Sequence, residues 1–305
     1  MPRRMPRNKP SNGASSLPAS GRSHRDDGDR KFPPHLLRDR GRHRNLPQSN
    51  DASEGVDAAE VVALVPNAVF VARDALSSEE CRMWIDHVEE GSLDGWDGVH
   101  HPATRSIAHR ECGRIRGNDW NTSHRLFRRI EGIVRHISPQ LDVVDETAIL
   151  WKSANVRRRG GGGGGGSSDD AREYRPITCN PNLRLYKYTK GQRFGRHVDE
   201  SNRIDVPRDQ VDGPSFSTVD AREGMRTEIT VLFYLSSCRG GATRFHLPRG
   251  IGKEEDSSVA FAPEEGAVLL HVHGDRCLEH EAEPVLEGVK YVLRTDIVYG
   301  WRKLK

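Results

Sequence analysis

Apolar residues in this chain gather in short groups whose spacing predicts strands and helices. Residues 61–71 carry Val, Leu and Phe side chains on both sides of a Pro-Asn turn, which is typical of two short strands. Ser77, followed three positions later by Glu80, forms a capping box, and the helix that it opens ends at Gly91. A second helix is predicted for residues 122–137, where one face is apolar: Leu126, Ile130, Ile133, Val134 and Ile137.

The second half of the chain has a different pattern. From Asn182 onward, short apolar runs are separated by Gly, Pro and Asp, which predicts a double-sheet jelly roll. Residues 201–227 are rich in Asp, Arg, Pro and Ser and form a long connection, which we interpret as a lid over a substrate. The predicted fold class is therefore α+β, with a mainly β core that follows the helices.

Two segments have compositions that do not favour a packed core. Residues 1–58 are rich in Arg, Pro, Ser and Gly, so we predict a disordered basic tail. A glycine run lies in a predicted flexible insertion, residues 152–175, and it lacks the Gly-Lys-Ser/Thr ending of a phosphate-binding loop. The folded domain is predicted to span residues 59–305, with a helical support region at 60–150 and the jelly roll at 180–302.

Charge and cysteine content restrict the partners and the compartment. The 305 residues have a net charge of +3, which gives no overall field that favours nucleic acid or a membrane surface. No apolar run is long enough to span a bilayer. Five widely spaced cysteines are typical of reduced thiols, and no apolar signal-peptide core lies near Met1. We expect an intracellular, cytoplasmic or nuclear protein that is not secreted, and the basic tail is also compatible with organellar transit. The sequence does not define the oligomeric state.

A polar run separates the two predicted helices. Residues 103–120 contain four arginines: Arg105, Arg110, Arg114 and Arg116. We predict that this run is a loop that leads towards the functional site. Its arginines could contact a substrate, but a solvated surface is the interpretation that we favour.

The strongest candidate for chemistry is the pair His197 and Asp199. Positions i and i+2 of an extended strand point to the same face, so an imidazole nitrogen and a carboxylate oxygen can meet one metal ion. With His280 they would form the facial triad of non-haem Fe(II) oxygenases, which leaves coordination positions open. His271 and His273 alternate on an apolar strand and are rival ligands, although we favour hydrogen bonding to a ligand or packing for them.

Four ordered blocks of sequence resemble the catalytic domain of prolyl 4-hydroxylase-type 2-oxoglutarate/Fe(II) dioxygenases. They are Tyr188 to Asp199 (YTKGQRFGRHVD), residues 230–245 (TVLFYLSSCRGGATRF), residues 259–273 (VAFAPEEGAVLLHVH) and His280 followed by PVLEGVKYVLRTD. The resemblance is close over residues 180–300 and loose over 60–150. It implies a double-stranded β-helix braced by N-terminal helices, and an enzyme that uses Fe(II), 2-oxoglutarate as cosubstrate and ascorbate as reductant.

The resemblance also implies roles for individual residues. Three side chains would hold iron: His197, Asp199 and His280. Lys290, ten residues after the last of these, matches a lysine that binds the distal carboxylate of 2-oxoglutarate, and Tyr188 matches a tyrosine that hydrogen-bonds it. Arg294 shares a strand face with Lys290 and is the alternative anchor, because arginine grips a carboxylate bidentately. Thr230 and Thr243 are candidates for lining the pocket.

The leading functional hypothesis is a dioxygenase that hydroxylates a peptide or protein side chain with release of succinate and CO2. The alternatives are an oxygenase of a nucleobase or small metabolite, and a non-catalytic jelly-roll binding protein. Nucleobase oxygenases carry an Arg-x-Asn-x-Thr-x-Arg pattern after the distal histidine, and Arg294-Thr295-Asp296 does not match it. A pure scaffold has no physical need for three iron ligands together with Lys290, which argues against a binding module.

Overall fold

The computed structural model describes residues 31–38, 61–90, 96–104, 108–141, 152–154, 172–205, 224–248 and 257–303. Within these ranges the α-helices are α1 (Ser78–Glu90) and α2 (Trp120–Leu141). The strands up to the glycine run and just after it are β1 (Val62–Val65), β2 (Val69–Ala72), β3 (Asp97–His101), β4 (Arg110–Asn118), β5 (Lys152–Ala154) and β6 (Arg172–Cys179). The later strands are β7 (Asn182–Tyr188), β8 (Phe194–His197), β9 (Arg203–Ile204), β10 (Met225–Tyr234), β11 (Arg239–Gly240), β12 (Thr243–His246), β13 (Ser258–Phe261), β14 (Val268–Val272), β15 (His280–Ala282), β16 (Val285–Glu287) and β17 (Lys290–Lys303).

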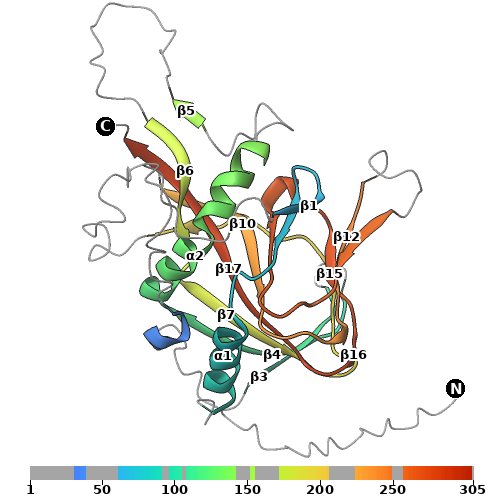
Figure 1. Cartoon of the computed structure of the whole chain (residues 1–305). Helices are drawn as coiled ribbons and strands as arrows, with labels where there is room; N and C mark the ends of the chain where they lie inside the picture. The colour runs from blue at the N-terminus through green and yellow to red at the C-terminus, as the bar shows by residue number, and fades with distance from the viewer. Residues whose placement is uncertain are drawn as a thin grey trace, which may run out of the picture.

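Antiparallel pairing joins most of these strands in one curved sheet. The order along it is β1-β2-β14-β10-β17-β7-β4-β8-β15-β12-β13, and β4 is joined to β8 through the pair Arg110 and Phe194. Figure 1 shows α1 and α2 on one side of the molecule and β12 and β15 on the other. The predicted fold class, a mainly β core of the jelly-roll type braced by N-terminal helices, is confirmed.

Side-chain alternation along the central strands separates two faces of the sheet. On β7, Leu183 and Leu185 are buried in the same apolar cluster as α1 and α2. Tyr186 and Tyr188, which follow at the alternate positions of the strand, lie in a second cluster with Cys112 of β4. Because adjacent residues of a strand point to opposite faces, one face packs on the helices and the other encloses a pocket.

Both predicted helices form, and their first turns show why. In α1 the Ser77 backbone N–H donates to Glu80 Oε2 (2.9 Å) and the Glu80 N–H donates to Ser77 Oγ (3.2 Å), which confirms the capping box. α2 begins before the predicted residue because Asp119 caps it, with Oδ1 accepting from the Thr122 N–H at 3.1 Å, and it ends at Leu141 instead of Ile137. All five predicted apolar residues of α2 are buried. The two helices are joined by the buried Glu80–Arg129 ion pair at 2.8 Å.

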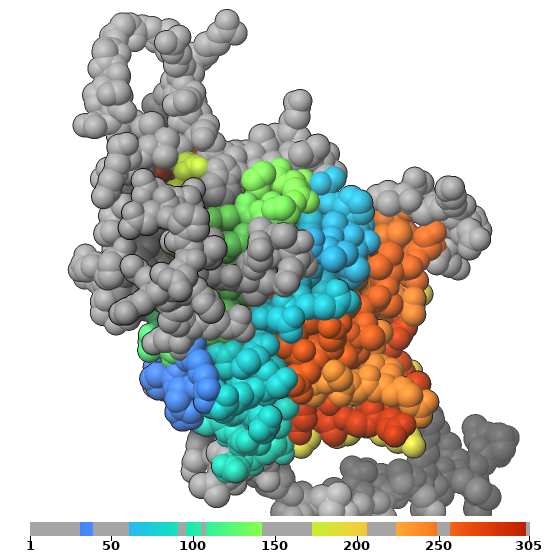
Figure 2. All heavy atoms as spheres, viewed as in Figure 1, coloured from blue at the N-terminus to red at the C-terminus, as the bar shows by residue number. Residues whose placement is uncertain are grey.

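Part of the predicted disordered tail is instead packed against the domain. Residues 31–38 include a short 3-10 helix, and Phe32, Leu36 and Leu37 are buried in the cluster that contains α1 and α2. The Phe32 N–H donates to Asp119 Oδ2 at 2.8 Å, and the Arg38 N–H donates to Glu80 Oε1 at 2.9 Å. Figure 2 shows this segment in blue against α1. The other residues of the predicted tail lie outside the described ranges.

The glycine run connects two paired strands. β5 and β6 are antiparallel, with Lys152 opposite Tyr174 and Ala154 opposite Arg172. The predicted insertion, residues 152–175, is therefore shorter at both ends than the sequence indicated, because its first and last residues are strand. Residues 155–171, which include the glycines, lie outside the described ranges.

The polar run between the helices is mainly strand, where the sequence predicted a loop. Residues 110–118 form β4, which pairs with β3 on one side and β7 on the other. The face of β4 that lines a cavity carries Arg110 and Arg114. The strand therefore lacks the alternation of apolar and polar residues by which a strand is normally identified. Arg116 is exposed and Arg105 lies outside the described residues.

The predicted lid and the membrane-spanning potential can be compared with the structure only over the described residues. Of the predicted lid, residues 201–227, the first few residues form β9 beside β10, and residues 206–223 lie outside the described ranges. Among the described residues, neither α1 nor α2 is long and apolar enough to cross a membrane.

Candidate metal centre

The three predicted iron ligands come together at one end of the pocket. His197 ends β8, Asp199 follows it, and His280 begins β15, where the antiparallel register places it opposite His197. Each offers one ligand atom, and these atoms lie within 4.8 Å of one another. Asp199 and His280 are buried, with 7% and 4% of their surface exposed. Pairing of β8 with β15 therefore closes the 83-residue gap that separates the histidines in sequence.

Backbone carbonyls orient both imidazoles for metal binding. Nδ1 of His197 lies 2.9 Å from the Gly195 carbonyl oxygen, and Nδ1 of His280 lies 2.9 Å from the Leu278 carbonyl oxygen. Because a carbonyl only accepts hydrogen bonds, Nδ1 carries the proton and Nε2 keeps a free lone pair. Burial lowers the pKa of both histidines, to about 4 for His197, so both rings are neutral at physiological pH. Neutral imidazole is the form that binds a metal ion.

Asp199 is held ionised by its neighbours. Burial opposes the charge, but the Arg294 guanidinium, with Nη2 2.9 Å from Oδ1, holds the pKa of Asp199 well below its usual range. The Thr230 hydroxyl donates to Oδ2 at 2.9 Å, so its oxygen accepts from His273 Nδ1 at 3.0 Å. His273 therefore contacts the Asp199 carboxylate only indirectly, through the Thr230 hydroxyl. Such bonds fix the direction of a metal-binding carboxylate.

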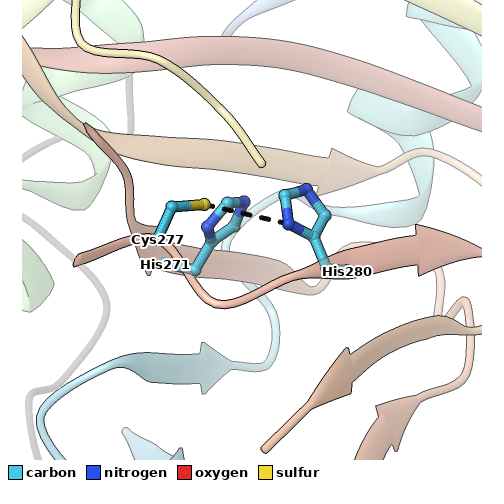
Figure 3. A group of neighbouring side chains, drawn as sticks. All are labelled: His271, Cys277 and His280. Carbon is cyan, nitrogen blue, oxygen red and sulfur yellow. Dashed lines mark hydrogen bonds between the residues drawn. The ribbon is translucent and has the colours of Figure 1, made fainter. Parts of the chain in front are cut away.

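His271 lies closer to the metal group than His273 does. Its ring centre is 4.5 Å from that of His280, and its Nε2 is 3.5 Å from Asp199 Oδ2. His271, Cys277 and His280 form a second possible metal group, shown in Figure 3, in which Cys277 Sγ lies 3.9 Å from His280 Nδ1. Burial raises the pKa of the Cys277 thiol to about 11, so it is protonated at neutral pH. The group that contains an ionised carboxylate fits Fe(II) better.

A pocket extends from the metal group into the interior of the sheet. This inner pocket is lined by the three candidate ligands and by Tyr188, Thr230, Thr243, Lys290 and Arg294, and it encloses about 450 Å³ of empty space, part of it open to solvent. Both threonines therefore lie where the sequence expected them. The inner pocket has a cation, hydroxyl groups and a candidate metal group on its walls, which suits a small anion that also binds metal.

Lys290 lies at the inner pocket with only 2% of its surface exposed. Its Nζ donates to the Gly241 carbonyl at 2.7 Å and lies 5.5 Å from the centre of the Tyr188 ring. Burial lowers its pKa to about 8, so at neutral pH it is protonated, and no carboxylate in the described ranges forms an ion pair with it. A carboxylate entering the pocket would supply a counter-ion.

Arg294 already has carboxylate partners. Its Nη2 lies 2.9 Å from Asp199 Oδ1 and 3.6 Å from Asp296 Oδ1. Arg294 is next to Arg184 across β17 and β7, and Asp296 also pairs with Arg184 at 2.5 Å. These ion pairs offset the repulsion between the two arginines. The geometry therefore favours Lys290 over Arg294 as the cation left for a cosubstrate.

A second cavity adjoins the metal group from the solvent side. This outer cavity shares Arg110, Tyr186, Phe194, His197, Asp199 and Arg294 with the inner pocket, and Arg114, Arg184 and Val198 line it further out. The sequence favoured a solvated surface for Arg110 and Arg114. That interpretation is wrong for Arg110, whose Nε and Nη2 are buried, whereas Arg114 is half-buried at the wall of this cavity. The signal that could have identified them is the i, i+2 spacing of Arg110, Cys112 and Arg114 on one strand face.

One family model matches the region that carries the site. Residues 183–295 match the 2OG-Fe(II) oxygenase superfamily. This stretch runs from β7 to β17 and includes all six predicted site residues: Tyr188, His197, Asp199, His280, Lys290 and Arg294. No curated protein sequence matches the chain significantly.

Several solved structures are similar at low sequence identity. A viral collagen prolyl hydroxylase from Paramecium Bursaria Chlorella virus-1 is 13% identical, with 76% of this chain and 96% of that chain covered and a TM-score of 0.39. A Pseudomonas putida prolyl-4-hydroxylase is 13% identical, with 81% and 99% covered and a TM-score of 0.42. A Trichoplax adhaerens prolyl hydroxylase in complex with a hypoxia inducible factor peptide fragment is 17% identical, with 79% and 88% covered and a TM-score of 0.41.

Proposed function

We propose that this chain is a 2OG-Fe(II) oxygenase, the superfamily that residues 183–295 match, and that it hydroxylates a peptide or protein side chain. The reaction would consume O2 and 2-oxoglutarate and release succinate and CO2. The observation that carries the proposal is one pocket that joins the His197, Asp199 and His280 group to the buried cation Lys290. The peptide class rests on the resemblance of the four motif blocks to prolyl 4-hydroxylases.

The donor set fits Fe(II). Two imidazole Nε2 atoms and one ionised carboxylate form a group that leaves coordination positions free for the cosubstrate and O2. His197, Asp199 and His280 would hold the ion, while the Gly195 and Leu278 carbonyls keep both rings in the binding tautomer. When bound, iron with 2-oxoglutarate supplies the oxidant that a closed-shell C–H bond requires, and the protein supplies orientation.

The residues of the inner pocket would bind and orient the cosubstrate. Lys290 would pair with the distal carboxylate of 2-oxoglutarate, a charge-assisted contact in a site with little water. Tyr188 lies beside Lys290 and would hydrogen-bond the same end of the molecule. Thr230 would hold Asp199 in the orientation that metal binding needs. Ascorbate would serve as reductant for turnovers in which no substrate is oxidised.

Succinate formation without substrate tests the proposal. Purified protein with Fe(II), 2-oxoglutarate and ascorbate is expected to produce succinate slowly, measured by mass spectrometry alongside bound iron. His197→Ala, Asp199→Ala and His280→Ala should each lose iron and succinate formation, because each removes a ligand. His136→Ala, which changes an exposed histidine on α2, is the matched control and should behave as wild type. Retention of wild-type iron content and turnover by any of the three site variants would refute the ligand assignment.

Incubation with peptides tests the substrate class. Product peptides that gain one oxygen, identified by fragmentation spectra, would support side-chain hydroxylation and identify the residue. Succinate formation that is stimulated by a small metabolite and by no peptide would instead favour the small-metabolite alternative.

A further inference from the structure

The outer cavity is unusually rich in arginine for a space that opens beside a metal group. Four arginines line it, Arg110, Arg114, Arg184 and Arg294, whereas its carboxylates are Asp199 and Glu200. Glu200 is exposed, and Asp199 belongs to the candidate metal group. The cavity encloses about 990 Å³ of empty space that extends into solvent, which is ample for part of a peptide.

The four arginines differ in whether the described residues neutralise them. Arg184 and Arg294 both pair with Asp296, and Arg294 also pairs with Asp199. Among the described residues, no carboxylate forms an ion pair with Arg110 or with Arg114. Positive charge in the outer cavity is therefore concentrated on two side chains of β4, at positions i and i+4 of one strand face.

Arg110 is fixed in place and has hydrogen-bond donors to spare. Its guanidinium carbon lies 4.6 Å from the Tyr186 ring centre and 4.5 Å from the Phe194 ring centre. Its Nε and Nη2 are buried and have no hydrogen-bond partner among the described residues, and the same holds for Arg114 Nε. Buried donors without partners are rare in folded proteins, so such a group indicates a missing acceptor.

Arg110 also lies next to the reaction centre. The Phe194 ring that it contacts stacks on the His197 ring with 3.7 Å between ring centres. Arg110 lines both the inner pocket and the outer cavity, whereas Lys290 lines the inner pocket and Arg114 the outer cavity. An acceptor held by Arg110 and Arg114 would therefore lie on the solvent side of the metal group, away from the subsite of Lys290.

We propose that Arg110 and Arg114 bind an anionic group of the prime substrate, a carboxylate or a phosphate, close to the carbon that is hydroxylated. The planar guanidinium of Arg110, held between two rings, suits bidentate binding of such a group. The proposal rests on the proposed function, because it names the chemistry of the substrate of the same site. It makes Arg110 and Arg114 residues that determine substrate specificity.

Binding of a defined peptide library tests the proposal. The protein is loaded with Mn(II) and 2-oxoglutarate, so that the inner pocket is filled and turnover is prevented, and is exposed to blocked Ac-X-X-Pro-X-X-NH2 peptides. Retained peptides are identified by mass spectrometry. We expect Asp, Glu or phosphoserine to be enriched about tenfold over Asn, Gln or Ser at one or more positions, as a charge-assisted contact requires. The enrichment should fall as NaCl is raised.

Charge-removing variants on one strand provide the controls. Arg110→Gln and Arg114→Gln should each lose most of the enrichment, and Arg110→Lys should restore part of it. Arg116→Gln removes a positive charge from an exposed position of β4, and this variant should keep the enrichment of acidic peptides. Circular dichroism establishes that each variant is folded, and Arg114→Gln serves as the second probe if Arg110→Gln does not fold. Unchanged enrichment in both Gln variants would overturn the proposal, and so would equal retention of acidic and neutral peptides by a protein that also binds no small anion through these two arginines.

A second arm distinguishes the source of the anion. Glutarate and inorganic phosphate are titrated into the same loaded protein, and their binding is measured against the two variants. Binding of these small anions that the variants lose, without acidic enrichment in the library, would assign the site to a free acid. Binding of neither small anions nor acidic peptides would overturn the proposal. So would an Arg110→Gln variant that weakens 2-oxoglutarate binding as much as Lys290→Met does.

Failure of the proposed function gives a different result. If the protein makes no succinate with Fe(II) and 2-oxoglutarate but still retains acidic peptides through Arg110 and Arg114, the oxygenase assignment fails and the anion site stands. If succinate forms but neither acidic peptides nor small anions bind through Arg110 and Arg114, the anion site fails and the oxygenase assignment stands.

Discussion

Burial of the charged Lys290 side chain destabilises the folded chain when no anion pairs with it. Its pKa of about 8 compares with about 10.4 for a lysine in an unfolded chain. Between these values the unfolded chain binds more protons than the folded one, so this contribution to stability becomes more favourable as pH rises through that window. Below about pH 8 Lys290 is charged in both states, so the free-energy cost of burying its charge is fully present. A dicarboxylate that pairs with Lys290 offsets this cost and raises the pKa of Lys290, so cosubstrate binding above about pH 8 is coupled to proton uptake.

The affinity for 2-oxoglutarate should therefore depend on pH. In the Mn(II)-loaded protein we expect a constant dissociation constant below about pH 8 and a rise towards about tenfold per pH unit above it, because only protonated Lys290 pairs with the carboxylate. Lys290→Arg keeps its charge throughout this range and should give a flat profile. Arg294→Ala should weaken binding less than Lys290→Ala, because Arg294 already pairs with two carboxylates. Equilibrium titration at several pH values measures this. A larger loss in Arg294→Ala would make arginine the anchor.

At the residue scale, the metal group was predictable and the arginines were not. The two-residue spacing of His197 and Asp199 predicts a shared face from strand geometry alone. His280 was accessible only through the resemblance of its flanking sequence, since no local pattern predicts that β8 pairs with β15. Arg110 was misinterpreted because a charged residue is usually solvated, and only the fold reveals that its strand faces a cavity.

At the scale of elements, the segment of residues 31–38 stabilises a helix pair far from the site. It is bound through buried Phe32, Leu36 and Leu37 and through backbone N–H groups that use Asp119 and Glu80 as acceptors. Sequence alone could not predict it, because eight residues with three apolar side chains are too few to show a periodicity. Their burial depends on the apolar cluster that they share with residues of α1 and α2, which are distant in the chain.

Truncation measures what this segment contributes. A chain that begins at residue 31 should unfold in urea at nearly the same concentration as the full chain. Removal of residues 1–38 should lower the free energy of unfolding by about 3 kcal/mol or more, since each buried apolar side chain contributes about 1.5–3 kcal/mol before ordering entropy is subtracted. Phe32→Ala in the full chain should account for a large part of that loss. Equal stability of the two truncated chains would show that the packing contributes nothing.

In contrast to residues 31–38, the glycine run is expected to contribute little to stability. Deletion of Gly160 to Ser168 should leave folding and succinate formation nearly unchanged, because residues 155–159 and 169–171 still connect β5 to β6 and closure entropy varies slowly with loop length. Chemical denaturation and succinate assays on the deletion variant test this. A loss of several kcal/mol in unfolding free energy would assign the run a structural role.

At the scale of the whole molecule, two cavities adjoin the same candidate metal group. The inner pocket is enclosed by β7, β10 and β17, whose Tyr188, Thr230 and Lys290 face inward, and the outer cavity opens beside β4 and β8. The sequence predicted a jelly-roll-type core with helices, and its resemblance to a known family singled out Lys290 and Tyr188, which line the inner pocket. It could not predict the outer cavity, since that space is defined by the pairing of β4 with β7 and β8, which are distant in the chain.

The melting temperature of the whole chain should rise first with metal and then with 2-oxoglutarate, if the metal binds first and the cosubstrate second. At about 100 times its dissociation constant a ligand adds roughly 2.7 kcal/mol to stability, and for a domain of this size each kcal/mol raises Tm by about 2–4 °C. Mn(II) alone should therefore raise Tm by about 5–10 °C, and 2-oxoglutarate should add a further rise only when metal is present, because it binds the metal and Lys290 together. His280→Ala should lose both shifts, and Lys290→Met should keep the metal shift and lose most of the second. His136→Ala should keep both. An equal 2-oxoglutarate shift with and without metal, measured by differential scanning fluorimetry, would mean that the cosubstrate does not bind at this centre.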